Sequence, residues 1–218
     1  LPEYLNTVCP LYPIKLIKTV RLRVAKVEPL LQDPAMDLKV ILLVRDPRGV
    51  YNSRGSGQVT TWCKDDSCAD PATGCRDLMA DVKAAEQLAA KYTNSVTLVR
   101  YEDLSLLPEE TARAILRFLD LPWHAVMDKY IDSHTSREKM KMVRNKVTKK
   151  LEKVKDMYGT ARNSTATAFA WRQKLGLGNV TEIQSLCSEP MARLGYRSLH
   201  TREELAMADL PLDKTAEE

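Results

Sequence analysis

Apolar residues in this chain gather in short runs separated by longer polar stretches. Three runs, Ile14–Val20, Val40–Val44 and Ser95–Val99, are rich in Val, Ile and Leu. Runs of this length and composition are typical of buried strands in a parallel sheet. The pattern therefore predicts three strands.

Between and after these runs, apolar residues recur every three or four positions, the spacing of a helix that packs one face on a core. One such stripe covers Leu78–Tyr92, and another begins at Pro108, a residue suited to the first turn of a helix. Shorter stripes predict helices at Trp123–Ile131 and Val180–Met191, the second of which stops at Gly195. Strands that alternate with helices predict an α/β fold in which helices flank a parallel sheet.

Length and composition fit one globular domain. The chain has 218 residues, of which 44% are apolar and 28% charged, values typical of a folded protein. We assign residues 1–200 to the domain and expect the acidic, aperiodic residues 201–218 to be a disordered tail. No apolar run approaches the roughly 20 residues of a membrane-spanning helix. Because the first residue is Leu1 and no signal peptide precedes it, we expect the N-terminal side to be incomplete.

Positive charge is concentrated in one segment. The whole chain carries +4, but the segment Ser133–Tyr158 carries +6, which leaves −2 for the rest. Such a segment favours an anionic partner, and a solvated loop without a partner is the alternative. Nucleic acid is disfavoured as the partner, because Tyr158 is the only aromatic residue of the segment that could stack on bases.

Three of the five cysteines, Cys63, Cys68 and Cys75, fall in one polar stretch. Their spacing does not match the close cysteine pairs of zinc sites, so no metal is predicted. Two N-glycosylation sequons, at Asn163 and Asn179, favour the oxidising lumen of the secretory pathway. We therefore expect at least one disulfide among the three cysteines, with Cys68–Cys75 as the favoured pair.

The segment from Lys39 to Arg54 carries the clearest candidate chemistry. A predicted strand ends at Val44, and Arg45 follows at its carboxyl end, where ligands bind in open α/β sheets. Pro47 suits the first turn of a helix that would carry Ser53. An arginine fork and a serine hydroxyl can both donate hydrogen bonds to a phosphate. The alternative is a structural pair between Arg45 and Asp46 that caps the turn.

The run Val44–Arg54 resembles the 3′-phosphate-binding loop of sulfotransferases, in particular the Golgi carbohydrate 6-O-sulfotransferases. Further stretches agree in order and spacing with that family. They are Ile17–Arg21, Leu98–Leu104, Arg162–Ala168, Trp171–Arg172 and Leu194–Tyr196. The resemblance covers about Lys15 to Tyr196, which is nearly the whole chain.

The resemblance implies an α/β fold with a P-loop-like parallel sheet flanked by helices, incomplete at its N-terminal side. It also implies transfer of a sulfuryl group from 3′-phosphoadenosine 5′-phosphosulfate to a sugar hydroxyl, typically the 6-hydroxyl of GlcNAc, Gal or GalNAc. The implied partner is a glycan acceptor, an anionic one if the basic segment contacts it, and no metal or nucleic acid takes part. The implied location is the Golgi lumen, with a single-pass type II anchor in the part missing here.

By the same resemblance, Arg45 and Ser53 hold the 3′-phosphate, and the residues between them form its loop. These are Asp46, Pro47, Arg48, Gly49, Val50, Tyr51 and Asn52. Tyr101 lies near the nucleotide, and Arg162 and Ser164 close over it. The alternatives are a structural role for Tyr101 and a plain glycosylated loop around Asn163.

One part of the family pattern is not found. The upstream loop that binds the 5′-phosphosulfate is absent from this sequence, and no catalytic base is identified. Two other functions therefore stay open: a P-loop nucleotide kinase-like phosphotransferase whose glycine loop is missing, and a non-catalytic glycan-binding fragment.

Overall fold

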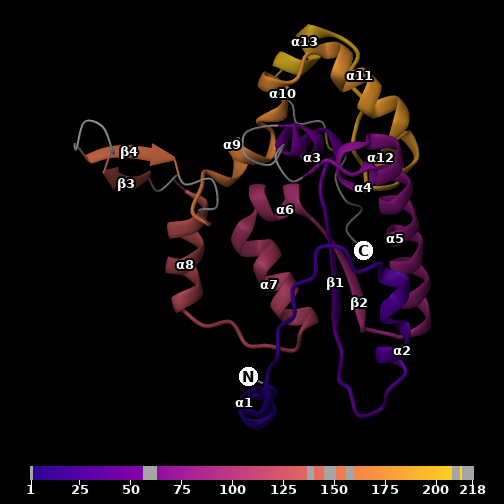
Figure 1. Ribbon diagram of the computed structural model, residues 1–218, viewed down its shortest axis with the longest axis vertical. Helices are drawn as coiled ribbons and strands as arrows, with labels where there is room; N and C mark the ends of the chain where they lie inside the picture. The colour runs from indigo at the N-terminus through magenta and orange to yellow at the C-terminus, as the bar shows by residue number, and fades with distance from the viewer. Residues whose placement is uncertain are drawn as a thin grey trace.

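A computed structural model describes residues 2–55, 63–136, 140–144, 151–155, 160–207 and 212 of the chain. Its central sheet is a parallel pair of strands, β1 (Val40–Val44) and β2 (Val96–Arg100), with Val44 opposite Arg100 (Figure 1). Two of the three predicted strands are thus confirmed, the later one shifted by one residue. A parallel pair joined by a helix also confirms the predicted α/β class.

The helix that joins the strands is α5 (Pro71–Lys91), predicted from the stripe at Leu78–Tyr92. It starts earlier than the stripe because Asp70 caps it: the Asp70 carboxylate accepts from the amides of Ala72 at 3.1 Å and Thr73 at 2.9 Å. The inward face of α5 packs on both strands in two apolar clusters. Its buried residues are Cys75, Met79, Val82, Ala84, Ala85 and Leu88.

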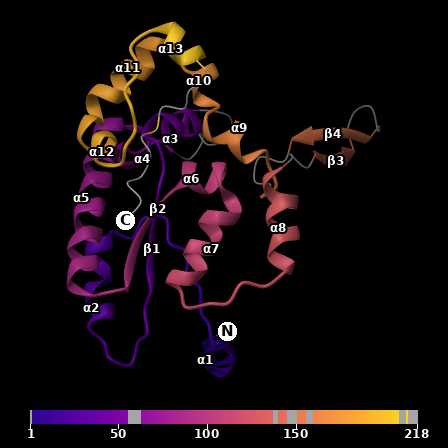
Figure 2. The same cartoon turned by 180° about the vertical axis from the view of Figure 1, so that it is seen from behind.

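Three helices follow β2 on the side of the strands opposite α5 (Figures 1 and 2): α6 (Tyr101–Leu106), α7 (Pro108–Phe118) and α8 (Val126–Thr135). The helix predicted from Pro108 is confirmed. The helix predicted at Trp123–Ile131 begins three residues later, because the His124 imidazole accepts the amide of Val126 at 3.2 Å and holds the chain in a turn.

The C-terminal part is built of short helices and one pair of strands. The helix predicted at Val180–Met191 is two helices, because Pro190 has no N–H for the carbonyl of Leu186, where the first one ends. The second ends at Arg193, and Gly195 follows its C-cap with a φ of 71°, which suits glycine, so the predicted stop at this glycine is confirmed. The elements are α9 (Ser164–Ala168), α10 (Trp171–Lys174), α11 (Leu177–Leu186), α12 (Ser188–Arg193), α13 (Arg202–Ala206), β3 (Met140–Arg144) and β4 (Leu151–Lys155).

The N-terminal part is mostly irregular, and the strand predicted at Ile14–Val20 is wrong. Leu16 is 92% exposed and Ile17 is 82% exposed. An apolar run becomes a buried strand only when a sheet edge receives it, and the described parallel sheet ends at β1 and β2. The remaining helical segments are α1 (Pro2–Val8), η1 (Cys9–Leu11), η2 (Val24–Val27), α2 (Glu28–Leu31), α3 (Pro47–Arg54) and α4 (Asp66–Ala69).

Two other segments contain regular structure where residues are described. The basic segment contains an antiparallel pair, β3 and β4, rather than only loop, while residues 137–139, 145–150 and 156–159 lie outside the described residues. The tail is helical at α13, because Thr201 and Glu204 form a capping box. Leu212 bridges to Tyr196, and the tail residues 208–211 and 213–218 lie outside the described residues. None of the helices in the described part of the chain is both long and apolar enough to cross a membrane.

Two disulfides are present, Cys63–Cys68 and Cys75–Cys187. The expectation of a bridge among the three clustered cysteines is confirmed, but the favoured pair is wrong. Cys75 lies on the inward face of α5, where its Cα is 5.2 Å from that of Cys187 at the end of α11. Helical geometry therefore turns Cys75 towards the core and away from its neighbours in sequence.

The two bridges should differ in their effect on stability. Cys75–Cys187 spans 112 positions and Cys63–Cys68 only 5. From the chain entropy of the unfolded state, removing the first bridge should lower the free energy of unfolding by about 5 kcal/mol, and removing the second by about 2 kcal/mol. We expect Cys75→Ala with Cys187→Ala to lower the free energy of unfolding in urea about twice as much as Cys63→Ala with Cys68→Ala. Equal losses would contradict this reasoning.

Candidate functional site

The candidate loop leaves the carboxyl end of β1 and turns directly into α3. Asp46 is the N-cap of α3, and its carboxylate accepts the amide of Arg48 at 2.9 Å. Pro47 takes the first helical position, where the missing N–H costs nothing. The predicted strand–turn–helix is therefore present.

Asp46 and Arg48 form an ion pair inside the protein. Both side chains are 0% exposed, and Arg48 Nη2 donates to the Asp46 carboxylate at 2.7 Å. A second donor of Arg48, Nη1, reaches Gln184 Oε1 at 2.8 Å and the carbonyl of Arg197 at 2.9 Å. The guanidinium also lies 4.2 Å from the centroid of the Trp171 ring. Arg48 is thus engaged on all sides, and the alternative pairing of Asp46 with Arg45 is wrong.

Glu102 fastens the end of β2 to the same turn. Its carboxylate is 0% exposed and accepts both the amide of Asp46 at 3.1 Å and the hydroxyl of Tyr196 at 2.8 Å. Burial raises the pKa of Glu102, and burial next to this carboxylate raises the pKa of Tyr196 as well. These bonds join the ends of both strands to the C-terminal part of the chain.

Arg100 makes a parallel connection from the last residue of β2. Its guanidinium donates to the Asp103 carboxylate at 2.8 Å and to the carbonyl of Leu194 at 2.9 Å. The desolvation that burial imposes on this guanidinium opposes the effect of Asp103, and the net result is a raised pKa of Arg100. The carboxyl edge of the sheet is therefore held by charged side chains that are paired within the protein.

Arg45 differs from these groups because it keeps unused donors. Its guanidinium lies 4.5 Å from the centroid of the Tyr101 ring, and Nη2 reaches the carbonyl of Thr167 at the long distance of 3.3 Å. Its Nε has no hydrogen-bond partner among the described residues. A Cβ added at Gly49 would lie 3.1 Å from that Nε, so glycine lets the helix approach the arginine closely. Arg45 is the described loop residue best placed to take an anionic ligand.

The structure brings only part of the predicted set together. Arg45 and Tyr101 are in contact, whereas Ser53 is exposed in the last turn of α3, six residues after Pro47 or about 9 Å along the helix axis. Pro47 is buried with Asp46 and Arg48. Val50 and Asn52 are half-buried on α3, and the Tyr51 hydroxyl donates to the carbonyl of Asp70 at 3.1 Å.

The segment predicted to close over the nucleotide lies against α6. Ser164 Oγ donates to the carbonyl of Ser105 at 2.7 Å, and the amide of Arg162 donates to the carbonyl of His134 at 2.9 Å. Asn163 caps α9, with Oδ1 accepting the amide of Ala166 at 2.9 Å. Through Thr167, on the same short helix, the segment reaches Arg45.

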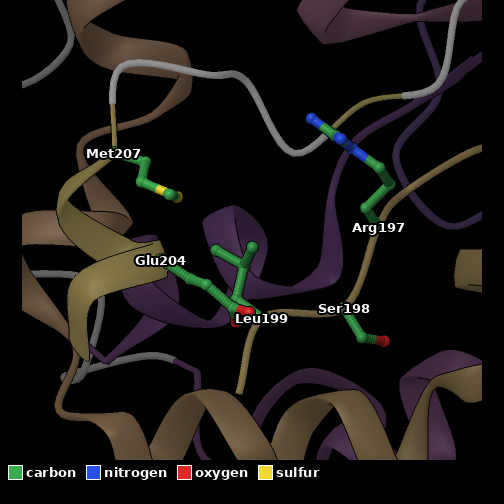
Figure 3. Close-up of a pocket in the computed structure, with 5 residues that line it drawn as sticks. All are labelled: Arg197, Ser198, Leu199, Glu204 and Met207. Carbon is green, nitrogen blue, oxygen red and sulfur yellow. The ribbon is translucent and has the colours of Figure 1, made fainter. Parts of the chain in front are cut away.

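Sequence reasoning missed the residues that support the loop from a distance. Gln184 is 136 positions away from Arg48 in sequence, so no local pattern connects the two. Trp171 stands out in the sequence only as part of the family resemblance. Its buried Nε1 has no partner among the described residues. A further unpredicted feature is a pocket of about 190 Å³ between α13 and the residues that follow Tyr196 (Figure 3). It is lined by Arg197, Ser198, Leu199, Glu204 and Met207. Across the described residues, no three His, Cys, Asp or Glu side chains lie close enough to hold a metal ion.

Comparison with known proteins assigns this architecture. The sulfotransferase domain family matches residues 22–195. Carbohydrate sulfotransferase 1 of Homo sapiens is 34% identical over 210 residues, which cover 87% of this chain and 46% of the relative. Carbohydrate sulfotransferases 2 and 5 of Mus musculus are each 30% identical and cover 90% and 94% of this chain, against 42% and 53% of their own lengths. No solved structure matches. The chain spans about half the length of the curated relatives it matches.

The buried carboxyl of Glu102 predicts a pH-dependent stability. Because burial raises its pKa above the unfolded value of about 4.5, the folded state holds a proton that the unfolded state loses as the pH rises. The contribution of Glu102 to the free energy of unfolding is therefore fully present below the pKa of the unfolded state. It is lost as the pH rises through the raised pKa of the folded state. Each unit of pKa shift corresponds to about 1.4 kcal/mol.

We expect Glu102→Gln, which keeps an acceptor for the amide of Asp46, to gain stability relative to the wild type as the pH rises. Urea unfolding at pH 4.5 and pH 7.5 measures the difference in free energy at each pH. Glu182→Gln, which changes an exposed glutamate on α11, serves as the control and should show no comparable pH-dependent gain. A Glu102→Gln difference that is the same at both pH values would show that Glu102 does not titrate as proposed.

Proposed function

We propose that this chain, which belongs to the sulfotransferase domain family, binds the 3′-phosphate of 3′-phosphoadenosine 5′-phosphosulfate in a carbohydrate sulfotransferase. The observation that carries the proposal is Arg45, at the carboxyl end of a parallel strand, with donors that the protein leaves unused. A planar guanidinium suits phosphate because two N–H groups reach two oxygens at once.

The surroundings of Arg45 fit a nucleotide phosphate. The Tyr101 ring lies against the guanidinium and limits its rotation, so the donors keep one direction. Asp46, the nearest carboxylate in sequence, is neutralised by Arg48 and does not compete with the ligand for Arg45. The Tyr101 and Arg162 positions then border the nucleotide, and the exposed Ser53 hydroxyl in the last turn of α3 is the second donor that we propose for the 3′-phosphate.

The reaction is an in-line displacement at sulfur. A sugar hydroxyl oxygen attacks the sulfur, the bond from sulfur to the 5′-phosphate oxygen breaks, and adenosine 3′,5′-bisphosphate leaves with the electron pair while a base takes the hydroxyl proton. The contribution of this chain is to bind and orient the donor, which lowers the barrier by positioning. Charge that grows on the leaving phosphates is stabilised by cationic donors that are already in place.

The acceptor follows from the names of the relatives, which are carbohydrate sulfotransferases. We propose the 6-hydroxyl of GlcNAc, Gal or GalNAc as the acceptor group.

The two disulfides support an oxidising compartment, and we assign the protein to the Golgi lumen with a type II membrane anchor upstream. The match to the sulfotransferase domain favours this function over a P-loop nucleotide kinase. A glycan-binding role without transfer predicts glycan affinity but no sulfated product.

Replacing Arg45 tests the phosphate site. A charge-assisted hydrogen bond contributes about 1.5–3 kcal/mol, so Arg45→Ala should weaken binding of adenosine 3′,5′-bisphosphate by about ten- to a hundredfold. Titration calorimetry on the full-length protein measures this affinity. Binding of adenosine 5′-monophosphate, which has no 3′-phosphate, should change little.

The matched control is Arg193→Ala, which removes an exposed arginine paired with Glu86 on the surface. It should leave both affinities unchanged. If Arg45→Ala still prefers the bisphosphate by the wild-type factor, the 3′-phosphate lies elsewhere.

The basic segment supplies a test of the acceptor. Lys146, Lys149 and Lys150 lie outside the described residues, so the argument rests on the charge of +6 in the sequence. If the segment contacts an anionic glycan, changing these three lysines to Ala should raise the KM for a sulfated acceptor several-fold. The KM of the donor should stay the same, and the effect should shrink with salt because exposed charges are screened over about 8 Å.

A control variant with the same loss of charge distinguishes local contact from net charge. It carries alanine at Lys26, Lys83 and Lys91. This control should leave the acceptor KM near that of the wild type. Equal acceptor KM values for both variants and the wild type, at low and high salt, would establish that the basic segment is solvated and touches no substrate.

A further inference from the structure

We propose that Asn179 carries an N-linked glycan and that the other sequon, at Asn163, remains unmodified. Both sites match the acceptor pattern Asn-X-Ser/Thr, as Asn163-Ser164-Thr165 and Asn179-Val180-Thr181. The sequence alone ranks them equally, whereas their surroundings in the fold differ. The inference rests on the proposed function in one respect, because the glycan is added only to a chain that enters the secretory lumen.

The disulfides support passage through that lumen. Cys63–Cys68 and Cys75–Cys187 are formed between side chains that are all nearly fully buried. Disulfides of this kind persist in the oxidising compartments where N-glycosylation also takes place. This evidence is independent of the sequons and of the candidate nucleotide site.

Asn179 lies on the outer face of α11. The neighbouring Val180 and Ile183 are 0% and 5% exposed and pack inward, whereas Asn179 is exposed and its side chain makes no hydrogen bond to any described residue. A Cβ built at Gly176 or Gly178 would meet no atom within 4 Å, so the surface on this side of the helix is open. A branched oligosaccharide can therefore leave Asn179 without displacing any part of the fold.

The hydroxyl of this sequon is also uninvolved in tertiary packing. Thr181 Oγ1 donates to the carbonyl of Leu177 within the same helix at 2.9 Å. Figures 1 and 2 place α11 on the outer rim of the molecule, across α3 and α10 from α9. A glycan at this position faces solvent and stays clear of the segment that contacts Arg45.

Asn163 is also exposed, but its side chain and the hydroxyls of its sequon are bonded within the fold. It caps α9 through Oδ1, and the hydroxyls of Ser164 and Thr165 both donate to the carbonyl of Ser105, at 2.7 and 3.3 Å. The sequon is thereby fixed against α6. One turn further, the carbonyl of Thr167 accepts from Arg45. A glycan attached here would begin at the border of the proposed nucleotide site and obstruct it.

The modification is a transfer of an oligosaccharide from a polyprenyl diphosphate carrier, which is the co-reactant. The Nδ2 atom of Asn179 forms a bond to the anomeric carbon of the first sugar. The bond from that carbon to the diphosphate oxygen breaks, the diphosphate keeps the electron pair, and the proton that the amide loses passes to solvent. Oδ1 and one N–H of the side chain remain.

The test uses the full-length protein expressed in cultured mammalian cells. Digestion with peptide N-glycosidase in heavy-oxygen water converts each glycosylated Asn to labelled Asp, and peptide mapping then reads both sites. We expect the label at Asn179 and none at Asn163. Asn179→Gln should lower the mass of the intact protein by one glycan, and Asn163→Gln, the matched control, should leave the number of glycans unchanged.

Thr181→Ala gives a second way to remove the site while Asn179 itself stays in place. It should also remove one glycan, which shows that the sequon rather than a structural effect of Asn179 is responsible. An unlabelled Asn179, or a labelled Asn163, overturns the inference. The nucleotide calorimetry keeps the two proposals apart: a glycan at Asn179 without bisphosphate binding refutes only the proposed function, and binding without this glycan refutes only the inference.

Discussion

A carboxylate and a guanidinium that are both withdrawn from water, those of Asp46 and Arg48, hold the start of α3 against the C-terminal part of the chain. Charges in a protein interior are tolerated only when they are paired and their remaining donors and acceptors are satisfied. Arg48 meets this condition through Gln184 and the carbonyl of Arg197, which lie more than 130 positions away in sequence. The loop therefore takes its shape only when the C-terminal helices have docked.

The same constraint explains why two arginines three positions apart have different roles. Arg48 belongs to the first turn of α3 and points into the protein, where Trp171 covers its guanidinium. Arg45 precedes the cap and lies beside Tyr101, partly exposed and with donors unused. Because Arg48 already neutralises Asp46, Arg45 has no carboxylate of its own loop to pair with. Arg45 Nε therefore keeps no hydrogen-bond partner among the described residues.

The edge of the sheet is fixed by groups that belong to three separate parts of the chain. Glu102 follows β2, Tyr196 follows α12, and the amide of Asp46 precedes α3, yet one buried carboxylate joins all three. The disulfide between Cys75 and Cys187 ties the start of α5 to the end of α11. Together these links make the candidate site the meeting point of distant segments and give it a rigid base.

The sequence by itself determined the features that depend on neighbours in the chain. The strand Val40–Val44, the helical stripe Leu78–Tyr92 within α5 and the turn into a helix at Pro47 follow from local periodicity and turn chemistry. Tertiary structure decided the rest: the partner of Cys75, the pairing of Asp46 with Arg48, and the exposure of Leu16 and its neighbours. Local patterns indicate which side chains are buried or paired. The partner of each comes from a segment far away in sequence, and only folding brings the two within contact distance.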